Sequence, residues 1–466
     1  MRNFINVSIA ILFTSFVFAD NINFNEIIIP KNFKTETTFS GDLSDKDSFH
    51  LIFGKNKKNK KYTVFAYFFN GTEVIELPTL TTEKGYNILS YHYKDNVLSL
   101  LLTCNFKKKK SFLKKIDYNL RENNFKESDV YKHEDFVKLI RTKDRSILLY
   151  KKDEFLSIKE FIGDESVNTK ILKIDKLSSF SDYFKDKYVA TVRNDEFVRN
   201  GATNSLKLYY NNNSLNFTKD TDLFRNTEFI NLNLSKDSLF IEKKSFDNDF
   251  NGNFQKMASF FADDKLYQFI QTKEKAYINL FDTNTGLKLN SIILDESLNA
   301  YTKNNSKFQG IGDFLKHSKK SHYIVTITAN KTVNNNIRIR LDYVDIDYSY
   351  YNNFLNFNQM MHQMNQNLMR QNLPAGFGPN VNDEFVFNNA SVTKEKRFFE
   401  LLIDENGNLL NQNLPETIYK EIDKKKEIDH LKDISHFKYQ SSCFLKSGFR
   451  YIAYDKSSKS FIINTI

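Results

Sequence analysis

The stretch "MASFFADDKLYQFIQTKEKAYINLFDTNTGLKLNSIIL", Met257 to Leu294, indicates the fold class. It contains four short apolar runs of strand length, separated by Asp-Asp, Lys-Glu-Lys and Thr-Asn-Thr-Gly: Met257–Ala262, Leu266–Ile270, Ala276–Phe281 and Leu287–Leu294. Each separator is short enough for a hairpin, so the stretch predicts a meander of four antiparallel strands. Such a small sheet cannot bury both of its faces alone, and we therefore expect a neighbouring sheet on each side.

Similar hairpin units recur along the chain. "YTVFAYFFNGTEVIEL" turns at Asn70-Gly71, "FFELLIDENGNLLN" turns at Asn406-Gly407, and "YIAYDKSSKSFIINTI" turns at Ser457-Ser458. With only 14 Gly and 5 Pro in the chain, most turns must use Asn and Asp, which tolerate left-handed backbone. In the strand expected from Ile337, the apolar alternation slips after Tyr343, which predicts a bulge.

Repeated four-stranded sheets over some 400 residues indicate an all-β protein. We expect a β-propeller of about seven four-stranded blades with a small helical insertion, because radial repetition limits open sheet edges. Tandem β-sandwich domains are the alternative. The expected division is a signal peptide at 1–19, an N-terminal segment at 20–46 and the propeller at 47–466.

The meander and the hairpin spacing resemble the divergent β-propellers of exported bacterial proteins, at the level of the superfamily. No specific family follows from this resemblance. The chain contains no Trp, so it lacks both the tryptophan-aspartate repeat and the aspartate box of sialidases. It also lacks the Gly-Gly pair of kelch repeats.

One segment, 350–395, is rich in Asn, Gln and Met and departs from the strand pattern. Its apolar residues recur at spacings of three and four, which predicts one face of a helix: Phe354, Phe357, Met361, Met364 and Leu368. We interpret the segment as a helical insertion between strands. A second, highly charged helix is expected over Ile418 to Ile434.

The first residues have the form of a secretory signal peptide. Arg2 precedes a mostly apolar run, and Val17 and Ala19 occupy the small-residue positions before a cut ahead of Asp20. No later segment is long and apolar enough to span a bilayer. We therefore expect an exported protein that is periplasmic, cell-surface or extracellular and has no transmembrane segment.

The stretch "SFDNDFNGNFQKM", Ser245 to Met257, has the beginning of a calcium-binding loop. Asp247, Asp249 and Asn251 alternate before a glycine, and Asn253 could add its backbone carbonyl. However, the bidentate carboxylate expected at position twelve is absent, because Ala258 stands there. Two interpretations remain open: a turn between two strands, or a calcium site with Asp247, Asp249, Asn251 and Asn253 as ligands.

The two cysteines, Cys104 and Cys443, are too few for a disulfide-stapled scaffold or a four-cysteine zinc site. Because export would place them in an oxidising compartment, a single bridge between them is one hypothesis. Two buried, inert thiols are the other.

Removal of residues 1–19 takes away one basic residue, so 66 basic minus 57 acidic residues leaves a net charge of +9. Two lysine runs, Lys55–Lys61 and Lys107–Lys115, lie near the ends of adjacent predicted hairpins. If they share one face, they form a positive patch that suits a protein or an anionic polysaccharide. The alternative is a set of solvated loops that keep sheet edges from pairing. Nucleic acid is not expected as a partner of an exported protein.

Catalytic signatures are absent from the sequence, including Gly-x-Ser-x-Gly, His-Glu-x-x-His, Cys-x-x-Cys and the Walker phosphate loop. The leading hypothesis is an exported, non-catalytic propeller that presents loops to a macromolecular partner. One alternative is a periplasmic or extracellular hydrolase or lyase acting on polysaccharide or peptide, with acids converging at the central channel. Another is an envelope or surface component that assembles through the insertion.

Overall fold

The computed structural model describes residues 25–465 with the exception of internal gaps. These gaps are 106–110, 165–166, 175–179, 181–183, 185–188, 194–195, 199–203, 222–224, 236–238, 240, 249–252, 274, 303–310, 321–322, 346–397, 423 and 447. The described residues form seven sheets, which we call blades 1 to 7 in chain order.

Blades 1 to 3 are regular four-stranded antiparallel meanders in which neighbours in sequence are neighbours in the sheet. Blade 1 consists of β2 (Phe33–Asp42), β3 (Ser48–Asn56), β4 (Tyr62–Phe69) and β5 (Val74–Thr82). Blade 2 consists of β6 (Asn87–Lys94), β7 (Val97–Asn105), β8 (Ser111–Asn119) and β9 (Asn124–Lys132). Blade 3 consists of β10 (Phe136–Arg141), β11 (Arg145–Lys152), β12 (Phe155–Ile162) and β13 (Asn168–Lys173).

Blade 4 has five strands, because a short first strand pairs in parallel with the second. Its strands are β14 (Ala190–Val192), β15 (Leu206–Asn211), β16 (Ser214–Thr221), β17 (Asn226–Asn233) and β18 (Ile241–Asp247). Blade 5 is the meander expected from Met257–Leu294, with β19 (Phe254–Ala262), β20 (Lys265–Thr272), β21 (Ala276–Asp282) and β22 (Lys288–Leu294).

Short helices connect blade 5 to blade 6: η1 (Glu296–Leu298), α3 (Asn299–Thr302) and α4 (Ile311–Ser318). Blade 6 has three strands, β23 (Tyr323–Lys331), β24 (Ile337–Asp345) and β25 (Phe398–Ile403). An isolated bridge from Ile403 to Leu409 stands at the position of a fourth strand. β23 and β24 pair without a register shift, so the bulge predicted after Tyr343 was wrong.

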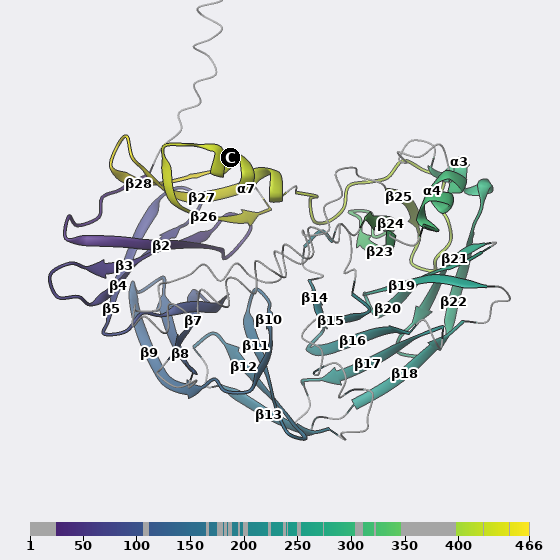
Figure 1. Ribbon diagram of the computed structural model, residues 1–466, viewed down its shortest axis with the longest axis horizontal. Coiled ribbons are helices and arrows are strands. Elements are labelled where there is room, and N and C mark those ends of the chain that lie inside the picture. The colour runs from purple at the N-terminus through teal and green to yellow at the C-terminus, as the bar shows by residue number, and fades with distance from the viewer. Residues whose placement is uncertain are drawn as a thin grey trace, which may run out of the picture.

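Blade 7 joins the two ends of the described chain. Helix α7 (Lys424–Asp433) precedes β26 (Phe437–Leu445), β27 (Gly448–Asp455) and β28 (Ser460–Thr465). The fourth strand is β1 (Asn25–Ile27), which pairs antiparallel with β28 and brings Ile27 opposite Phe461. Figure 1 shows the blades following one another around an arc, with β26–β28 returning beside β2. The chain is thus an all-β propeller.

Side chains from the first strands of several blades meet near the centre of this arrangement. The Tyr91 hydroxyl of β6 donates to Asp42 Oδ1 of β2 at 2.5 Å, and Arg141 of β10 lies 3.5 Å from the same oxygen. Arg193, directly after β14, is close enough to lower the pKa of Asp42. On the other side of blade 1, the Thr38 hydroxyl donates to the Tyr439 carbonyl of β26 at 2.8 Å. The first strands of five blades therefore surround one axis.

Among the described residues, hydrophobic clusters join six of the seven pairs of neighbouring blades. Alternation along each strand sends one set of side chains to each face, and both faces are apolar in most blades. At each of these interfaces, residues of both blades belong to one cluster. Examples are Ile52 with Ile463 for blades 1 and 7, Leu51 with Leu100 for blades 1 and 2, Leu101 with Leu148 for blades 2 and 3, Leu149 with Leu232 for blades 3 and 4, Phe229 with Phe261 for blades 4 and 5, and Ile278 with Ile339 for blades 5 and 6. Within the described chain, none of the clusters contains residues of both blade 6 and blade 7.

Candidate binding surfaces

The axial cluster contains one carboxylate and two guanidinium groups. Burial alone would raise the pKa of Asp42, but the charges of Arg141 and Arg193 and the hydroxyl of Tyr91 lower it to about 2. Arg141 also stacks on Tyr91, with its guanidinium carbon 4.1 Å from the ring centroid. Asp42 is therefore ionised and fully engaged, and it holds the first strands of blades 1, 2 and 3 together. It is not placed to act as a general acid or base.

A buried histidine joins blades 1 and 7. His50 of β3 is within hydrogen-bond distance of the hydroxyls of Ser40 at 2.8 Å and Ser48 at 3.0 Å. Arg450 of β27 donates to the Ser48 hydroxyl at 3.0 Å. Burial and the nearby charge of Arg450 lower the pKa of His50 to about 3, so the imidazole is neutral at physiological pH. The group serves as a polar link inside a blade interface.

The face of blade 6 that points away from blade 5 carries an ion-pair network. Arg338 donates two hydrogen bonds to Glu400, at 3.0 and 2.8 Å. The buried Arg340 contacts Asp342 at 3.4 Å and Glu421 at 3.3 Å. Three carboxylates thus converge on two arginines, and each is already neutralised by a guanidinium group. They form a structural network rather than the free acid pair that the hydrolase hypothesis requires.

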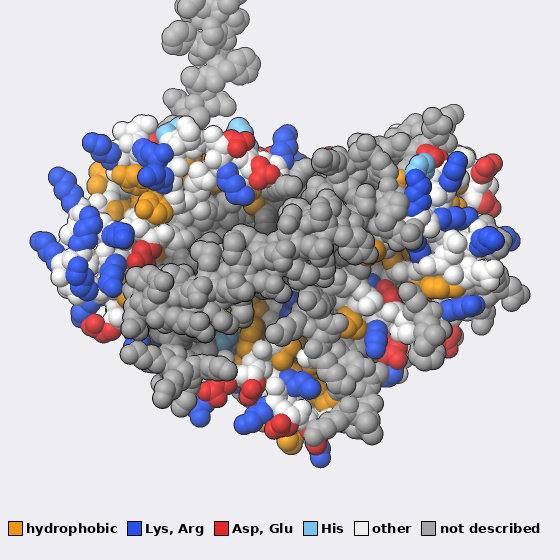
Figure 2. Space-filling model, in the orientation of Figure 1, with side chains coloured by type: hydrophobic (Ala, Val, Ile, Leu, Met, Phe, Trp, Pro, Cys, Tyr) orange, Lys and Arg blue, Asp and Glu red, His pale blue; other side chains and the backbone are white. Residues whose placement is uncertain are grey.

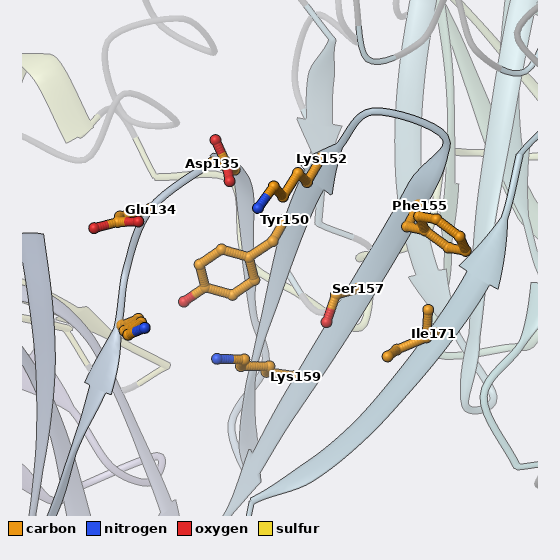
Figure 3. Close-up of a pocket in the computed structure, with 9 residues that line it drawn as sticks. Glu134, Asp135, Tyr150, Lys152, Phe155, Ser157, Lys159 and Ile171 are labelled. Carbon is orange, nitrogen blue, oxygen red and sulfur yellow. The ribbon is translucent and has the colours of Figure 1, made fainter.

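A groove of ≈ 550 Å³ opens between blades 2 and 3. Its floor is the face of blade 3 that looks toward blade 2, where strand register places side chains in rows across the sheet. One row contains Tyr150, Ser157 and Ile171, and the next contains Lys152 opposite Phe155. Figure 3 shows Lys152 and Lys159 on either side of the Tyr150 ring, with Phe155 and Ile171 to its right.

The groove exists because the two blades pack closely along only part of their interface. Leu101 and Leu113 of blade 2 meet Leu148 and Phe161 of blade 3 in a buried cluster. Beyond that cluster the floor stays accessible, and Phe155 and Ile171 are 49% and 65% exposed. The opposite wall is the end of β9 and the residues that follow it, Lys132, Glu134 and Asp135. This surface combines exposed apolar side chains with ammonium groups.

The lysine run Lys55–Lys61 forms an exposed basic edge on blade 1. The turn between β3 and β4 is shaped by Asn56, whose side chain accepts from the Lys58 amide at 2.9 Å. The Lys57 amide donates to the Asn32 carbonyl at 2.7 Å and so holds the preceding loop beside the turn. Lys31, Lys57, Lys58 and Lys60 are all exposed, and we call these four residues the lysine edge. Figure 2 shows lysine and arginine side chains gathered at the left of the molecule, over β2–β5.

The second lysine run, Lys107–Lys115, contributes less to a patch than the sequence indicated. Residues 107–110 lie outside the described residues. Lys114 pairs with Glu127, and Lys115 is buried and lies 3.0 Å from Asp117. Lys115 is opposite Leu101 of β7 and lies on the same face of β8 as the buried Leu113, so its side chain faces the interior. The expectation of a continuous basic patch across both runs is therefore wrong for Lys114 and Lys115.

The predicted calcium loop lies between two strands, as its flanks indicated. Asp247 is the last residue of β18, and Asn253 directly precedes β19. The Asp247 carboxylate accepts from the Ser245 hydroxyl at 2.8 Å. Asp249 and Asn251 lie outside the described residues. The calcium site therefore stays a prediction. In the described part of the chain, no group of three or more His, Cys, Asp or Glu side chains could hold a metal ion.

Cys443 lies buried on β26, and burial raises the pKa of its thiol. Cys104 lies on β7 of blade 2, and its side chain is outside the described part of the structure. The bridge between Cys104 and Cys443 stays a prediction.

The helical insertion expected at 350–395 also lies outside the described residues. The second helix is present but begins later than expected, at Lys424. It packs Leu431 on Phe449 and Tyr451 and so covers one face of blade 7. None of the helices that the structure describes is long and apolar enough to cross a bilayer.

Sequence reasoning did not find the groove between blades 2 and 3. Its residues come from the end of β9 and from three strands of blade 3, and they become neighbours only through register and blade packing. One signal was available, namely that Phe155 and Ile171 occupy strand positions on the same face as Ser157 and Lys159. An alternating strand with a mixed apolar and basic face indicates an incompletely covered surface.

No protein-family model matches the sequence, and the search of curated proteins finds no match. Among solved structures, the chain is similar to the β-propeller domain of the Trilobed protease from Pyrococcus furiosus. Identity is 9% and the TM-score is 0.31, over 67% of this chain and 83% of that one. It is also similar to the WD40 domain of SCAP from fission yeast, at 7% identity and a TM-score of 0.26, over 70% and 87% of the two chains.

A third similar structure is the subtype N10 neuraminidase-like protein of A/little yellow-shouldered bat/Guatemala/060/2010. It is 9% identical with a TM-score of 0.27, over 69% of this chain and 94% of that one. At these scores the similarities carry no argument about activity. The class of the protein, a β-propeller, follows from its own sheet order and from the pairing of β1 with β28.

Proposed function

We propose that this protein is an exported, non-catalytic binding propeller that holds an anionic polysaccharide at the lysine edge of blade 1. The observation that carries the proposal is the arrangement of Lys31, Lys57, Lys58 and Lys60. All four are exposed, and hydrogen bonds between two loops keep them together. Neighbouring Lys61 is different, because it pairs with Glu83 at 2.8 Å.

Exposed lysines on a fixed loop that form no ion pair among the described residues suit a polymer with spaced negative charges. Each exposed contact between an ammonium and an anion is weak and screened by salt, so useful affinity requires several contacts along one ligand. The rigid sheets of blade 1 hold the loop, which reduces the entropy lost on binding. Export, which residues 1–19 predict, would expose the lysine edge to such polymers.

The test compares binding of polygalacturonate, as an anionic probe, with neutral dextran. We expect the triple variant Lys57→Gln, Lys58→Gln and Lys60→Gln to bind polygalacturonate about tenfold more weakly at low salt, since three exposed ion pairs at about 0.5 kcal/mol each sum to about 1.5 kcal/mol. Dextran should not bind either protein.

A matched control removes three exposed lysines from blades 5 and 6 and the segment after blade 6, namely Lys288, Lys331 and Lys420. This control should bind polygalacturonate as the wild type does. Equal loss in both triple variants would show that only the net charge matters, and it would overturn the lysine edge as the site. Wild-type binding of dextran as strongly as polygalacturonate would overturn the proposed ligand class.

A further inference from the structure

We propose that the groove between blades 2 and 3 is a second binding site, which takes an apolar molecule of small-molecule size that carries one anionic group. The site is separate from the lysine edge and does not depend on the proposed function. Its ligand chemistry follows from three features of the groove: an ammonium group with no carboxylate partner among the described residues, a serine hydroxyl beside it, and an exposed apolar floor.

Lys159 is the central cation of the groove. Its ammonium nitrogen lies 4.9 Å from the centroid of the Tyr150 ring and 6.0 Å from that of Tyr131. Burial lowers the pKa of Lys159, and in the described residues it has no carboxylate within salt-bridge distance. A partly buried ammonium group that contacts aromatic faces, and no carboxylate of the described residues, has capacity for an anion.

Other groups of the groove complete an anion site. Ser157 lies two residues from Lys159 on the same face of β12 and directly opposite Tyr150 of β11. The Tyr150 hydroxyl is 2.9 Å from Nδ1 of His133. Burial and the charge of Lys159 lower the pKa of His133 to about 4, so this imidazole stays neutral and the positive charge of the groove comes from its lysines. Lys132 and Lys152 line the same groove and add two further ammonium groups.

The rest of the groove selects for an apolar body with little further charge. Phe155 and Ile171 are exposed on the floor and would be covered by a hydrocarbon or aromatic group. Glu134 and Asp135 on the opposite wall would repel a polyanion. The volume of ≈ 550 Å³ is within the range of small-molecule sites. A single-headed apolar anion satisfies all three conditions, whereas a polyanionic chain does not.

The experiment is titration calorimetry with four probes below their aggregation concentrations: decanoate, decyl phosphate, decanol and acetate. We expect decanoate or decyl phosphate to bind at least about tenfold more tightly than decanol, because a charge-assisted hydrogen bond is worth about that factor. Acetate keeps the carboxylate but leaves Phe155 and Ile171 uncovered, so it should also bind at least about tenfold more weakly than decanoate. The better of the two anions identifies the head group as carboxylate or phosphate. Decanol binding equal to that of both anions would overturn the anion site, and acetate binding equal to that of decanoate would overturn the apolar requirement.

Two variants test the groove itself, with a control on the same sheet. Lys159→Met keeps the aliphatic stem and should weaken binding of the anionic probe about tenfold. Phe155→Asp changes an exposed side chain and should weaken it at least as much, through charge repulsion and lost apolar contact. Lys151→Met, one strand over and on the opposite face of blade 3, should bind as the wild type does. Unchanged affinity in Phe155→Asp, or equal loss in Lys151→Met, would overturn the site.

Discussion

Lys207 and Asp220 form a buried ion pair at the contact of blades 4 and 5. The ammonium group of Lys207 lies 2.7 Å from Asp220 Oδ2, and both side chains are almost completely buried. Asp220 also accepts from the Thr227 hydroxyl at 2.9 Å and from the Ser259 amide of β19 at 3.1 Å. Each charge is therefore compensated by the other and by hydrogen bonds that reach the next blade.

Removing only one of the two charges should destabilise the folded protein. We expect Asp220→Asn to lower the free energy of unfolding by about 3–5 kcal/mol, because the variant leaves the charge of Lys207 buried without a partner. The double variant Lys207→Met with Asp220→Leu should recover most of this loss, since it removes both charges. Urea unfolding measures both values. A double variant as unstable as Asp220→Asn would contradict the claim that the two buried charges compensate each other.

His50 should make the protein sensitive to acid. Its pKa is about 3 in the folded protein and about 6.5 when unfolded, so between these values the unfolded chain binds the additional proton. His50 therefore does not change the free energy of unfolding above pH 6.5. Between pH 6.5 and the folded-state pKa of about 3, each unit by which the pH falls lowers the free energy of unfolding by about 1.4 kcal/mol from this group alone.

Replacing His50 by Gln should reduce the slope of unfolding free energy against pH by about one proton between pH 4 and 6. Urea titrations at several pH values give that slope, with His430→Gln on the exposed side of α7 as the control. An unchanged slope in His50→Gln would show that the imidazole is protonated in the folded state.

At the scale of single residues, the residues that form turns could be predicted from the sequence better than the side chains that lie on the surface. Asn and Asp do supply the left-handed turn residues, as at Asp263 and Asp264 with φ values of 48° and 57°. Lys115 shows the limit, because nothing in a lysine-rich run indicates which lysine lies on the buried face of the strand. The groove could not be predicted because Lys159 and Lys132 are brought together by blade packing and not by sequence spacing.

At the scale of elements, the short strand β1 completes blade 7. Only three residues pair with β28, yet Ile27 is buried in the cluster that joins blades 7 and 1. The neighbouring Ile28 is 82% exposed. Because strand β1 is so short, its attachment depends on the side chain of Ile27 as much as on backbone hydrogen bonds.

Ile27→Ala should lower the free energy of unfolding by about 2–4 kcal/mol, the usual cost of truncating a buried isoleucine. Ile28→Ala is the matched control and should change it by less than about 0.5 kcal/mol. Denaturant unfolding of the two variants under the same conditions measures both changes in the free energy of unfolding. Similar values for both would indicate that β1 does not dock on β28.

The elements that could be predicted from sequence are those with strong local periodicity. All four strands of blade 5 lie where the apolar runs of Met257–Leu294 indicated them, because hairpins that short leave little choice of register. Strands β14 and β1, at three residues each, carry no periodicity and are defined only by their neighbours. The bulge expected after Tyr343 was wrong because Val344 simply turns to the charged face of blade 6.

At the scale of the whole molecule, the seam between blades 6 and 7 differs from the other blade interfaces. Blade 6 presents Arg338 and Arg340 on the face away from blade 5, and α7 covers one face of blade 7. The hydrophobic clusters that the structure describes do not cross this seam. At this seam the described residues contribute no shared hydrophobic cluster, whereas the pairing of β1 with β28 completes blade 7 and the clusters at the other interfaces hold the remaining blades together.

The central claim is that one chain forms a ring of blades whose last blade contains strands from both ends. Disulfide trapping tests it most directly, with Glu26→Cys and Ile462→Cys in a chain whose own cysteines are replaced by alanine. These two residues are opposite each other in the β1–β28 pair. Mild oxidation followed by peptide mass spectrometry should find a 26–462 cross-link in the monomer, and none in a control that pairs Glu26→Cys with Lys288→Cys of blade 5. No 26–462 cross-link, or equal cross-linking in the control, would contradict the ring.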